Sequence, residues 1–114
     1  MNIIEERPWG KFEVLYDGPD CKLKRITVNS GGRLSLQYHH KRDEFWRIIS
    51  GSATITYHTE KMTLVAGDFI EIPREVHHRV ENLSNEPLVF IETQTGDYFG
   101  EDDIVRIEDD YNRI

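Results

Sequence analysis

Histidine is the first residue type in this chain of 114 residues that suggests chemistry, because its imidazole can bind a metal or carry a proton near neutral pH. The chain has five histidines: His39, His40, His58, His77 and His78. His58 is expected at the surface, in a turn beside Thr59 and Glu60. The other four form two adjacent pairs, and adjacent residues of a strand point to opposite faces. One member of each pair is therefore a candidate for an interior site.

Glu44 gives the clearest reason to place a site inside the protein. It shares one face of an expected strand with Trp46 and Ile48, and these large apolar side chains mark that face as inward. A buried carboxylate is costly unless it is paired or bound to a cation. We expect residues 40–43 to form a hairpin that returns Glu44 beside the strand ending at His39. The alternative is a surface hairpin on which these groups are solvated.

A second segment of the chain offers another imidazole to the same interior. A glycine turn at Gly67 precedes an apolar run that ends at Pro73, and His78 and Asn82 follow. This order favours a strand that carries His78 inward. Since residues two apart in a strand share a face, the candidate metal ligands are Gln37, His39, Glu44 and His78.

The spacing of these residues resembles the two motifs of the cupin superfamily. The first motif is matched by Gly31, Gln37, His39, Glu44 and Gly51. The second motif is matched by Gly67, Pro73, Glu75, His78 and Asn82. Gln37 stands where most cupins have a first histidine, and Glu75 stands where they have a turn glycine. The resemblance implies an all-β chain with a single jelly-roll barrel that holds a metal.

Further segments are similar to the isomerase domain of type II mannose-6-phosphate isomerases, in which the cupin often follows a mannose-1-phosphate guanylyltransferase domain. The similar segments are Arg7–Gly10, Gly32–Gln37, His39–Trp46, Gly100–Arg106 and Glu108–Tyr111. No segment matches the guanylyltransferase, so we expect a stand-alone isomerase domain. Phe45 stands where that family has histidine, so the resemblance implies the fold more directly than it implies catalysis.

The activity that this resemblance implies is the interconversion of mannose 6-phosphate and fructose 6-phosphate through an enediolate. The nitrogen and oxygen ligand set suits Zn, Mn, Fe, Co or Ni without selecting one of them. Such a metal would stabilise the developing negative charge, and a base must move the proton. The candidate catalytic residues are Glu44, His40 and Arg42, and His77 is a further candidate base or a surface residue.

Cations are needed for the phosphate of such a substrate. Arg33 shares strand parity with Gln37, and Arg42 lies in the expected hairpin loop, where a flexible guanidinium could pair with phosphate. Both are candidate substrate-binding residues, with solvated arginines as the alternative. The basic run Lys22, Lys24 and Arg25 is expected at an exposed edge. For Trp9 and Trp46, core packing is preferred to stacking on a sugar.

Two other functions remain open. A non-catalytic cupin that binds a sugar or a metal is one. The other is a non-haem iron oxygenase, because two histidines and one carboxylate form its ligand set.

The elements that must position these residues are short strands. Apolar or alternating runs rich in Ile, Val, Thr, Tyr and Phe recur between turn signals, which is typical of an antiparallel sandwich or barrel. The expected strands are Trp9–Tyr16, Cys21–Val28, Leu34–His39, Glu44–Ile49, Ser52–Tyr57, Met62–Val65, Phe69–Ile72, Val76–Val80 and Leu88–Gln94. We therefore expect one cupin domain over residues 1–114. Its barrel should span about residues 7–96, followed by a short acidic C-terminal extension, 97–114, with one or two helical turns.

Composition limits the partners. The net charge of −7 argues against nucleic acid, but residues 97–114 carry five of these negative charges, so an anionic sugar phosphate remains acceptable. No apolar run reaches the roughly 18–20 residues of a membrane span, which argues against a membrane partner. The N-terminus does not resemble a signal peptide and Cys21 is the single cysteine, so a cytoplasmic location is expected. Exposed edge strands favour a homodimer.

Overall fold

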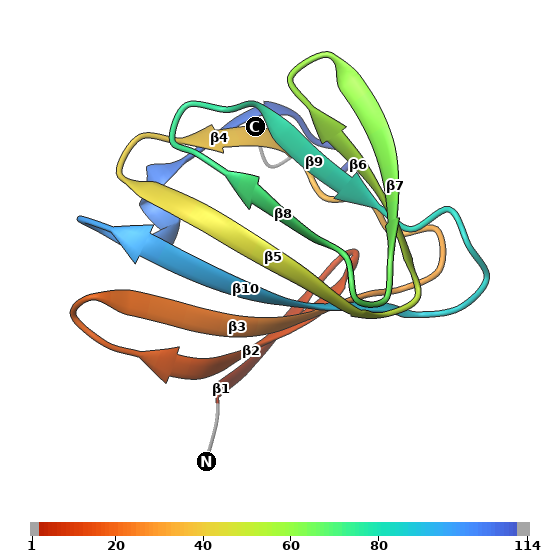
Figure 1. The fold of residues 1–114 in the computed structure, drawn as a ribbon, viewed down its shortest axis with the longest axis horizontal. Coiled ribbons are helices and arrows are strands. Elements are labelled where there is room, and N and C mark those ends of the chain that lie inside the picture. Colours follow the sequence, from red (N-terminus) through yellow and green to blue (C-terminus); the bar gives the residue numbers. More distant parts are fainter. Residues whose placement is uncertain (1–2, 112–114) are drawn as a thin grey trace.

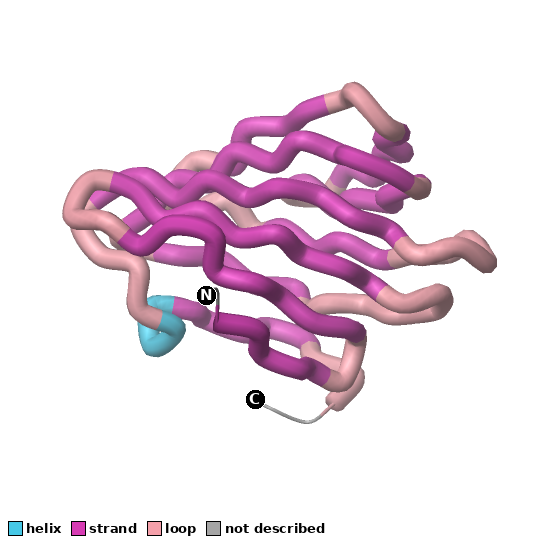
Figure 2. The backbone as a smooth tube through the Cα atoms, turned by 90° about the horizontal axis from the view of Figure 1, so that it is seen from below, coloured by secondary structure: helices cyan, strands magenta, loops and turns pink. Residues whose placement is uncertain are grey.

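The computed structural model describes residues 3–111 and shows two antiparallel sheets that face each other as a jelly-roll barrel (Figures 1 and 2). The six-stranded sheet has the order β1 (Ile3–Arg7), β2 (Gly10–Asp17), β3 (Cys21–Val28), β10 (Leu88–Gly96), β5 (Arg42–Ser50) and β8 (Phe69–Ile72). The five-stranded sheet has the order β11 (Ile104–Glu108), β4 (Leu36–His39), β9 (His78–Glu81), β6 (Ser52–Tyr57) and β7 (Glu60–Val65). A single turn of 3-10 helix, η1 (Glu101–Asp103), connects β10 to β11. The all-β jelly-roll architecture expected from the sequence is confirmed.

Every expected strand corresponds to an observed one, and β3, β6 and β8 have the expected bounds. The reason is visible in β5, where Arg42, Glu44, Trp46 and Ile48 are buried and alternate with more exposed residues. This period of two is the signature of a strand with one face on a core. Strands β1 and β11 were not expected, since the sequence of neither has an alternating buried face.

The core lies between the sheets and is built from the inward residues of both. Trp46 and Phe90 are adjacent there, with ring centroids 4.8 Å apart, and Ile55 and Val80 close the core from the other sheet. Trp9 is also almost fully buried. The preference for core packing of both tryptophans is therefore confirmed.

The hairpin expected over residues 40–43 is wrong. Strand β4 belongs to the five-stranded sheet and β5 to the six-stranded sheet, so the connection between them crosses from one sheet to the other (Figure 1). Glu44 pairs with Gln94 and Ile72 in its own sheet. His39 and Glu44 consequently face each other across the interior, which still brings both side chains to one place.

The boundary expected at residue 96 also differs from the structure. Strand β11 pairs with β4, with Ile104 opposite His39 and Arg106 opposite Gln37. Residues 104–108 are therefore part of the barrel wall, and η1 is the helical turn expected in the C-terminal stretch. At the other end of the chain, β1 adds an outer strand to β2 before the expected start of the barrel.

The edge strands of the two sheets are β1 and β8 in one and β11 and β7 in the other. Each presents unpaired backbone groups that a second copy could use, so the homodimer remains a prediction. Among residues 3–111, no helix is both long enough and apolar enough to span a membrane.

Asn82, the last residue of the second motif, holds two loops together. It is fully buried, and its side-chain amide donates to the carbonyl oxygens of Val28 and Glu86 at 3.0 and 2.7 Å. The Oδ1 of the same side chain accepts a hydrogen bond from the Ser84 backbone N–H at 3.0 Å. The motif asparagine is therefore structural.

Replacing this side chain should test that role. Asn82→Ala leaves the buried carbonyl of Val28 without its partner, so we expect the free energy of unfolding in urea to fall by about 2–3 kcal/mol. Asn85→Ala removes an exposed asparagine from the same loop and should change it by less than about 0.5 kcal/mol. Equal effects of the two changes would contradict the assignment.

Candidate functional site

Three buried side chains meet inside the barrel. His39 lies at the end of β4, Glu44 near the start of β5 and His78 at the start of β9. One potential ligand atom from each lies within 4.8 Å of the other two, and each residue is at most 3% exposed. The two imidazole centroids are 5.3 Å apart. Residues that the sequence proposed as metal ligands are thus close together in the structure.

His78 presents a free lone pair to this cluster. Its Nδ1 lies 2.9 Å from the carbonyl oxygen of Val76, a distance at which the ring N–H donates to that carbonyl. Its Nε2 lies 3.9 Å from Glu44 Oε1 and has no hydrogen-bond partner within the described part of the chain. A backbone acceptor that fixes the tautomer in this way is the usual support of a metal-ligating histidine. The donor set and this unpaired nitrogen fit a divalent metal.

Gln37 lies on β4 next to this cluster and lines an interior cavity beside it. Its Cα is paired with that of His78 across the β4–β9 ladder, and its side chain lines the cavity together with Arg42. Its Oε1 accepts a hydrogen bond from the Ser35 hydroxyl at 2.6 Å. An amide oxygen has two lone pairs, so this contact leaves one of them for a further partner.

Arg42 is not the flexible loop residue that the sequence predicted. It is the first residue of β5 and only 3% exposed. Its Nε donates to Glu44 Oε2, and its Nη2 donates to His39 Nε2, both at 2.9 Å. Because one lone pair serves one partner at a time, a metal on His39 Nε2 and the bond from Arg42 are alternatives.

The charges inside the barrel are arranged around Glu44. Burial alone would raise the pKa of this carboxyl, but the guanidinium of Arg42, with His78 and the Trp46 N–H, holds it below its usual value. The Trp46 Nε1 donates to Glu44 Oε1 at 3.0 Å. Burial, and then the neighbouring Glu44 carboxylate, raises the pKa of Glu92. The two neighbouring carboxyls are therefore shifted in opposite directions, with the pKa of Glu44 lowered and that of Glu92 raised.

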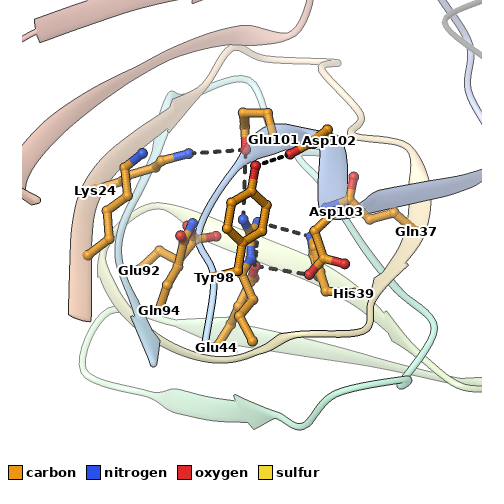
Figure 3. Close-up of polar contacts among 12 residues, drawn as sticks. Lys24, Gln37, His39, Glu44, Glu92, Gln94, Tyr98, Glu101, Asp102 and Asp103 are labelled. Atoms are coloured by element: carbon orange, nitrogen blue, oxygen red, sulfur yellow. Dashed lines mark hydrogen bonds and ion pairs between the residues drawn. The ribbon is translucent and has the colours of Figure 1, made fainter. Parts of the chain in front are cut away.

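Glu92, Gln94 and Lys24 are interior residues that the sequence analysis missed (Figure 3). Gln94 Nε2 donates to Glu92 Oε1, and Lys24 Nζ lies 4.1 Å from the centroid of the Phe12 ring. The exposed edge expected for Lys24 is wrong, because this residue is 4% exposed. The signal was available: Lys24 has the parity of Ile26 and Val28 in β3, and Glu92 and Gln94 have that of Phe90 in β10.

Several predicted residues lie outside the interior cluster. The ring of His40 is half exposed, and its Nδ1 lies 2.8 Å from Glu75 Oε1. His77 stacks on Tyr38 at 4.8 Å between centroids, consistent with the surface alternative. Arg33 lies 3.0 Å from Asp110 and does not line the interior cavity. The structure therefore does not bring His40, His77 or Arg33 to Glu44.

The two departures from the motifs also have structural explanations. Phe45 points to the outer face of the six-stranded sheet and stacks on Phe69, with centroids 5.4 Å apart. Phe45 therefore lies away from the interior candidate ligands. Glu75 takes the left-handed conformation that glycine would adopt, with φ of 70°, and its N–H donates to the carbonyl of His39 at 2.8 Å.

The interior cavity is small. Its volume is about 50 Å³, and the cations Arg7, Lys24, Arg42 and Arg106 are among its lining residues. A larger hollow of about 360 Å³ lies over the outer face of β5 and β8, beside Phe45 and Glu71. We place the candidate site in the interior because Glu92 and Arg42 line the small cavity there, and Arg42 contacts His39 and Glu44, which are buried beside it.

Acid should destabilise the metal-free protein through His39. Burial, then the charges of Arg42 and His78, lowers the pKa of His39 from 6.5 to about 3. Between these two pKa values the His39 imidazole is protonated in the unfolded chain and neutral in the folded one. The free energy of unfolding that is present above pH 6.5 is therefore lost as the pH falls. At pH 5 the expected loss is about 2 kcal/mol relative to pH 7 in urea unfolding.

Two histidine variants separate this effect from other titrations. His39→Gln should flatten the decrease between pH 7 and pH 5, whereas His58→Gln should retain it. A ring NMR titration of His39 with a midpoint above pH 5 would contradict the prediction.

Three comparisons with known proteins agree with this fold. Residues 3–109 match the family model described as "Mannose-6-phosphate isomerase C-terminal". The xanthan biosynthesis protein XanB of Xanthomonas campestris is 47% identical over 107 residues, covering 94% of this chain. The alginate biosynthesis protein AlgA of Pseudomonas aeruginosa is 44% identical over the same length. The chain spans 23% and 22% of the lengths of these two relatives.

Solved structures extend the likeness in fold. The capsular polysaccharide assembling protein CapF of Staphylococcus aureus superposes with a TM-score of 0.81 at 19% identity, over 95% of this chain and 33% of CapF. An RmlC-like cupin from Shewanella frigidimarina superposes with a TM-score of 0.76 at 20% identity, over 89% and 87% of the two chains. By sequence and by fold, the chain belongs to the cupin family of mannose-6-phosphate isomerase C-terminal domains.

Proposed function

We propose that this domain is a metal-dependent sugar-phosphate isomerase that interconverts mannose 6-phosphate and fructose 6-phosphate. The observation that carries the proposal is the unpaired Nε2 of His78, buried beside Glu44 and His39. A buried polar atom without a partner is costly, and a metal ion relieves that cost. The family match and the sugar-polymer roles in the names of XanB and AlgA support a sugar phosphate as the substrate.

The residues that would hold the metal are His39, Glu44 and His78, with Gln37 as the fourth ligand. When bound there, a divalent cation supplies a positive charge that stabilises the negative oxygens of an enediolate. Glu44, ionised and buried, contributes the one carboxylate of the set.

The proton that moves between neighbouring sugar carbons needs a group inside the barrel. Of the sequence candidates, His40 is directed to the surface, where it contacts Glu75. Glu92 is buried and lines the cavity, and Glu44 is buried next to Glu92, where Arg42 donates to it. We propose that Glu92 holds and returns this proton, with Arg42 keeping Glu44 ionised.

Lys24 and Arg42 are the cations best placed for the phosphate, because both are buried and both line the cavity. This assignment replaces Arg33, which is paired with Asp110. A cytoplasmic location, where phosphorylated sugars are made, belongs to the same proposal.

A non-catalytic sugar- or metal-binding cupin is the second candidate. The contact between Arg42 and His39 Nε2 favours it, because this contact occupies one of the two ring nitrogens that could bind a metal. The iron oxygenase has the composition of the ligand set in its favour, since His39, Glu44 and His78 are two histidines and one carboxylate.

Metal content gives the first test. His78→Ala should lower the bound divalent metal per chain at least tenfold in elemental analysis, while the β-rich circular dichroism spectrum persists. His58→Ala, in an exposed turn, should leave the stoichiometry unchanged. Equal metal content in both variants would exclude the proposed ligand set.

Turnover gives the second test. The metal-loaded protein should convert mannose 6-phosphate to fructose 6-phosphate, lose this activity with a chelator and regain it with added divalent metal. Glu92→Gln should lower kcat at least 100-fold with a smaller change in KM, because it removes the proton-transfer group.

Tight sugar-phosphate binding by calorimetry without turnover would establish the non-catalytic alternative. Oxygen uptake with a small organic substrate would establish the oxygenase.

A further inference from the structure

The turn η1 lies over the open end of the barrel, above the interior polar residues (Figure 3). The loop that carries it is tied to the β4–β5 connection on both sides of Glu101. Asp103 accepts hydrogen bonds from the backbone N–H groups of His40 and Lys41 at 3.3 and 3.0 Å. The Asp97 N–H donates to the Lys41 carbonyl at 2.9 Å. Glu101 is therefore held at the mouth of the cavity.

The Glu101 carboxylate lies between two buried cations. Its Oε2 is 3.5 Å from Lys24 Nζ and 3.8 Å from Arg42 Nη1. The two cations come from β3 and β5 and are 4% and 3% exposed, whereas the Glu101 side chain is 42% exposed. One partly solvated carboxylate thus faces both positive charges.

These contacts are ion pairs without good hydrogen bonds. Both distances exceed the 3.2 Å or so at which an N–H donates well to oxygen. Arg42 Nη1 is buried and has no hydrogen-bond partner in the region 3–111. A phosphate carries more charge and more acceptor oxygens than a carboxylate, so it would satisfy these two donors better.

The cavity below Glu101 is too small for a sugar phosphate as it stands. Its volume of about 50 Å³ holds one or two water molecules, whereas small-molecule sites have about 300 Å³ or more. Any anionic ligand that reaches Lys24 and Arg42 must therefore move the carboxylate at its mouth.

We propose that Glu101 is a carboxylate latch, which occupies an anion subsite formed by Lys24 and Arg42 until a phosphate group displaces it. The choice of phosphate rests on the function proposed above; the latch itself rests on the distances and burial of the three side chains. The apparent phosphate affinity equals the affinity of the open subsite multiplied by the fraction of molecules in which Glu101 does not occupy it. Removing the latch charge therefore raises that affinity.

Calorimetry with inorganic phosphate tests the latch on the full chain after removal of metal, so that the cations alone are probed. Glu101→Gln should bind phosphate at least about tenfold more tightly than the unaltered protein. Asp102→Asn changes the charge equally on the same turn, but Asp102 contacts the Tyr98 hydroxyl and neither cation. This control should stay within about twofold of the unaltered protein.

Lys24→Met in the Glu101→Gln background should abolish the gain. If the double variant does not fold, Arg7→Met in that background, which removes a more exposed lining cation, should retain most of it. Weaker or unchanged phosphate binding by Glu101→Gln, or an equal gain by Asp102→Asn, would overturn the latch. These outcomes do not depend on turnover, so a protein that binds phosphate but fails the isomerase assay loses the proposed function and keeps the latch.

Discussion

The burial of one carboxylate organises this barrel. Glu44 lies deep between the sheets, where an isolated charge would be prohibitively costly. The guanidinium of Arg42 neutralises it, the indole of Trp46 donates to it, and His39 and His78 approach it from the opposite sheet. Much of the polar interior replaces the hydration that this carboxylate lost when the barrel closed. The same arrangement makes Glu44 a candidate metal ligand, because His39 and His78 lie beside it with a set of atoms that could hold a cation.

The jelly-roll crossing makes the cluster possible. His39 and Glu44 are close in the chain but belong to different sheets, and the short connection between them is tied by Asp103 and by the N–H of Glu75. Glu75 adopts a left-handed conformation at this position, which disfavours residues with a Cβ. Its carboxylate contacts His40, so the outward histidine of the pair supports the turn that directs the inward one.

Sequence patterns predicted the strands and their inward-facing residues well, because both follow from the two-residue period of a β-strand. The candidate ligands His39, Glu44 and His78 were predicted from parity and motif spacing, and the structure brings their side chains together. Parity alone could not say which strands pair, so the connection after His39 was predicted as a hairpin. The position of Lys24 was predicted wrongly, because a run of basic residues usually lies on a solvent-exposed edge. In the structure the aromatic ring of Phe12 and the carboxylate of Glu101 contact this cation in the interior. The pairing of Arg33 with Asp110 depends on a contact between distant segments that no local pattern encodes.

The pairing of β3 with β10 has a consequence for the order of assembly. Val28 lies opposite Leu88 and Cys21 opposite Thr95, so the central seam of the larger sheet joins segments far apart in the chain. Such non-local closure is entropically demanding and makes folding slow. Strands β3 and β5, which carry Lys24 and Glu44, are joined through β10, so both charged side chains become enclosed together when this strand completes the sheet. A metal or anion that requires the closed barrel would then stabilise the native state alone, by mass action. In such a protein the supply of ligand during synthesis would influence how much chain reaches the folded form.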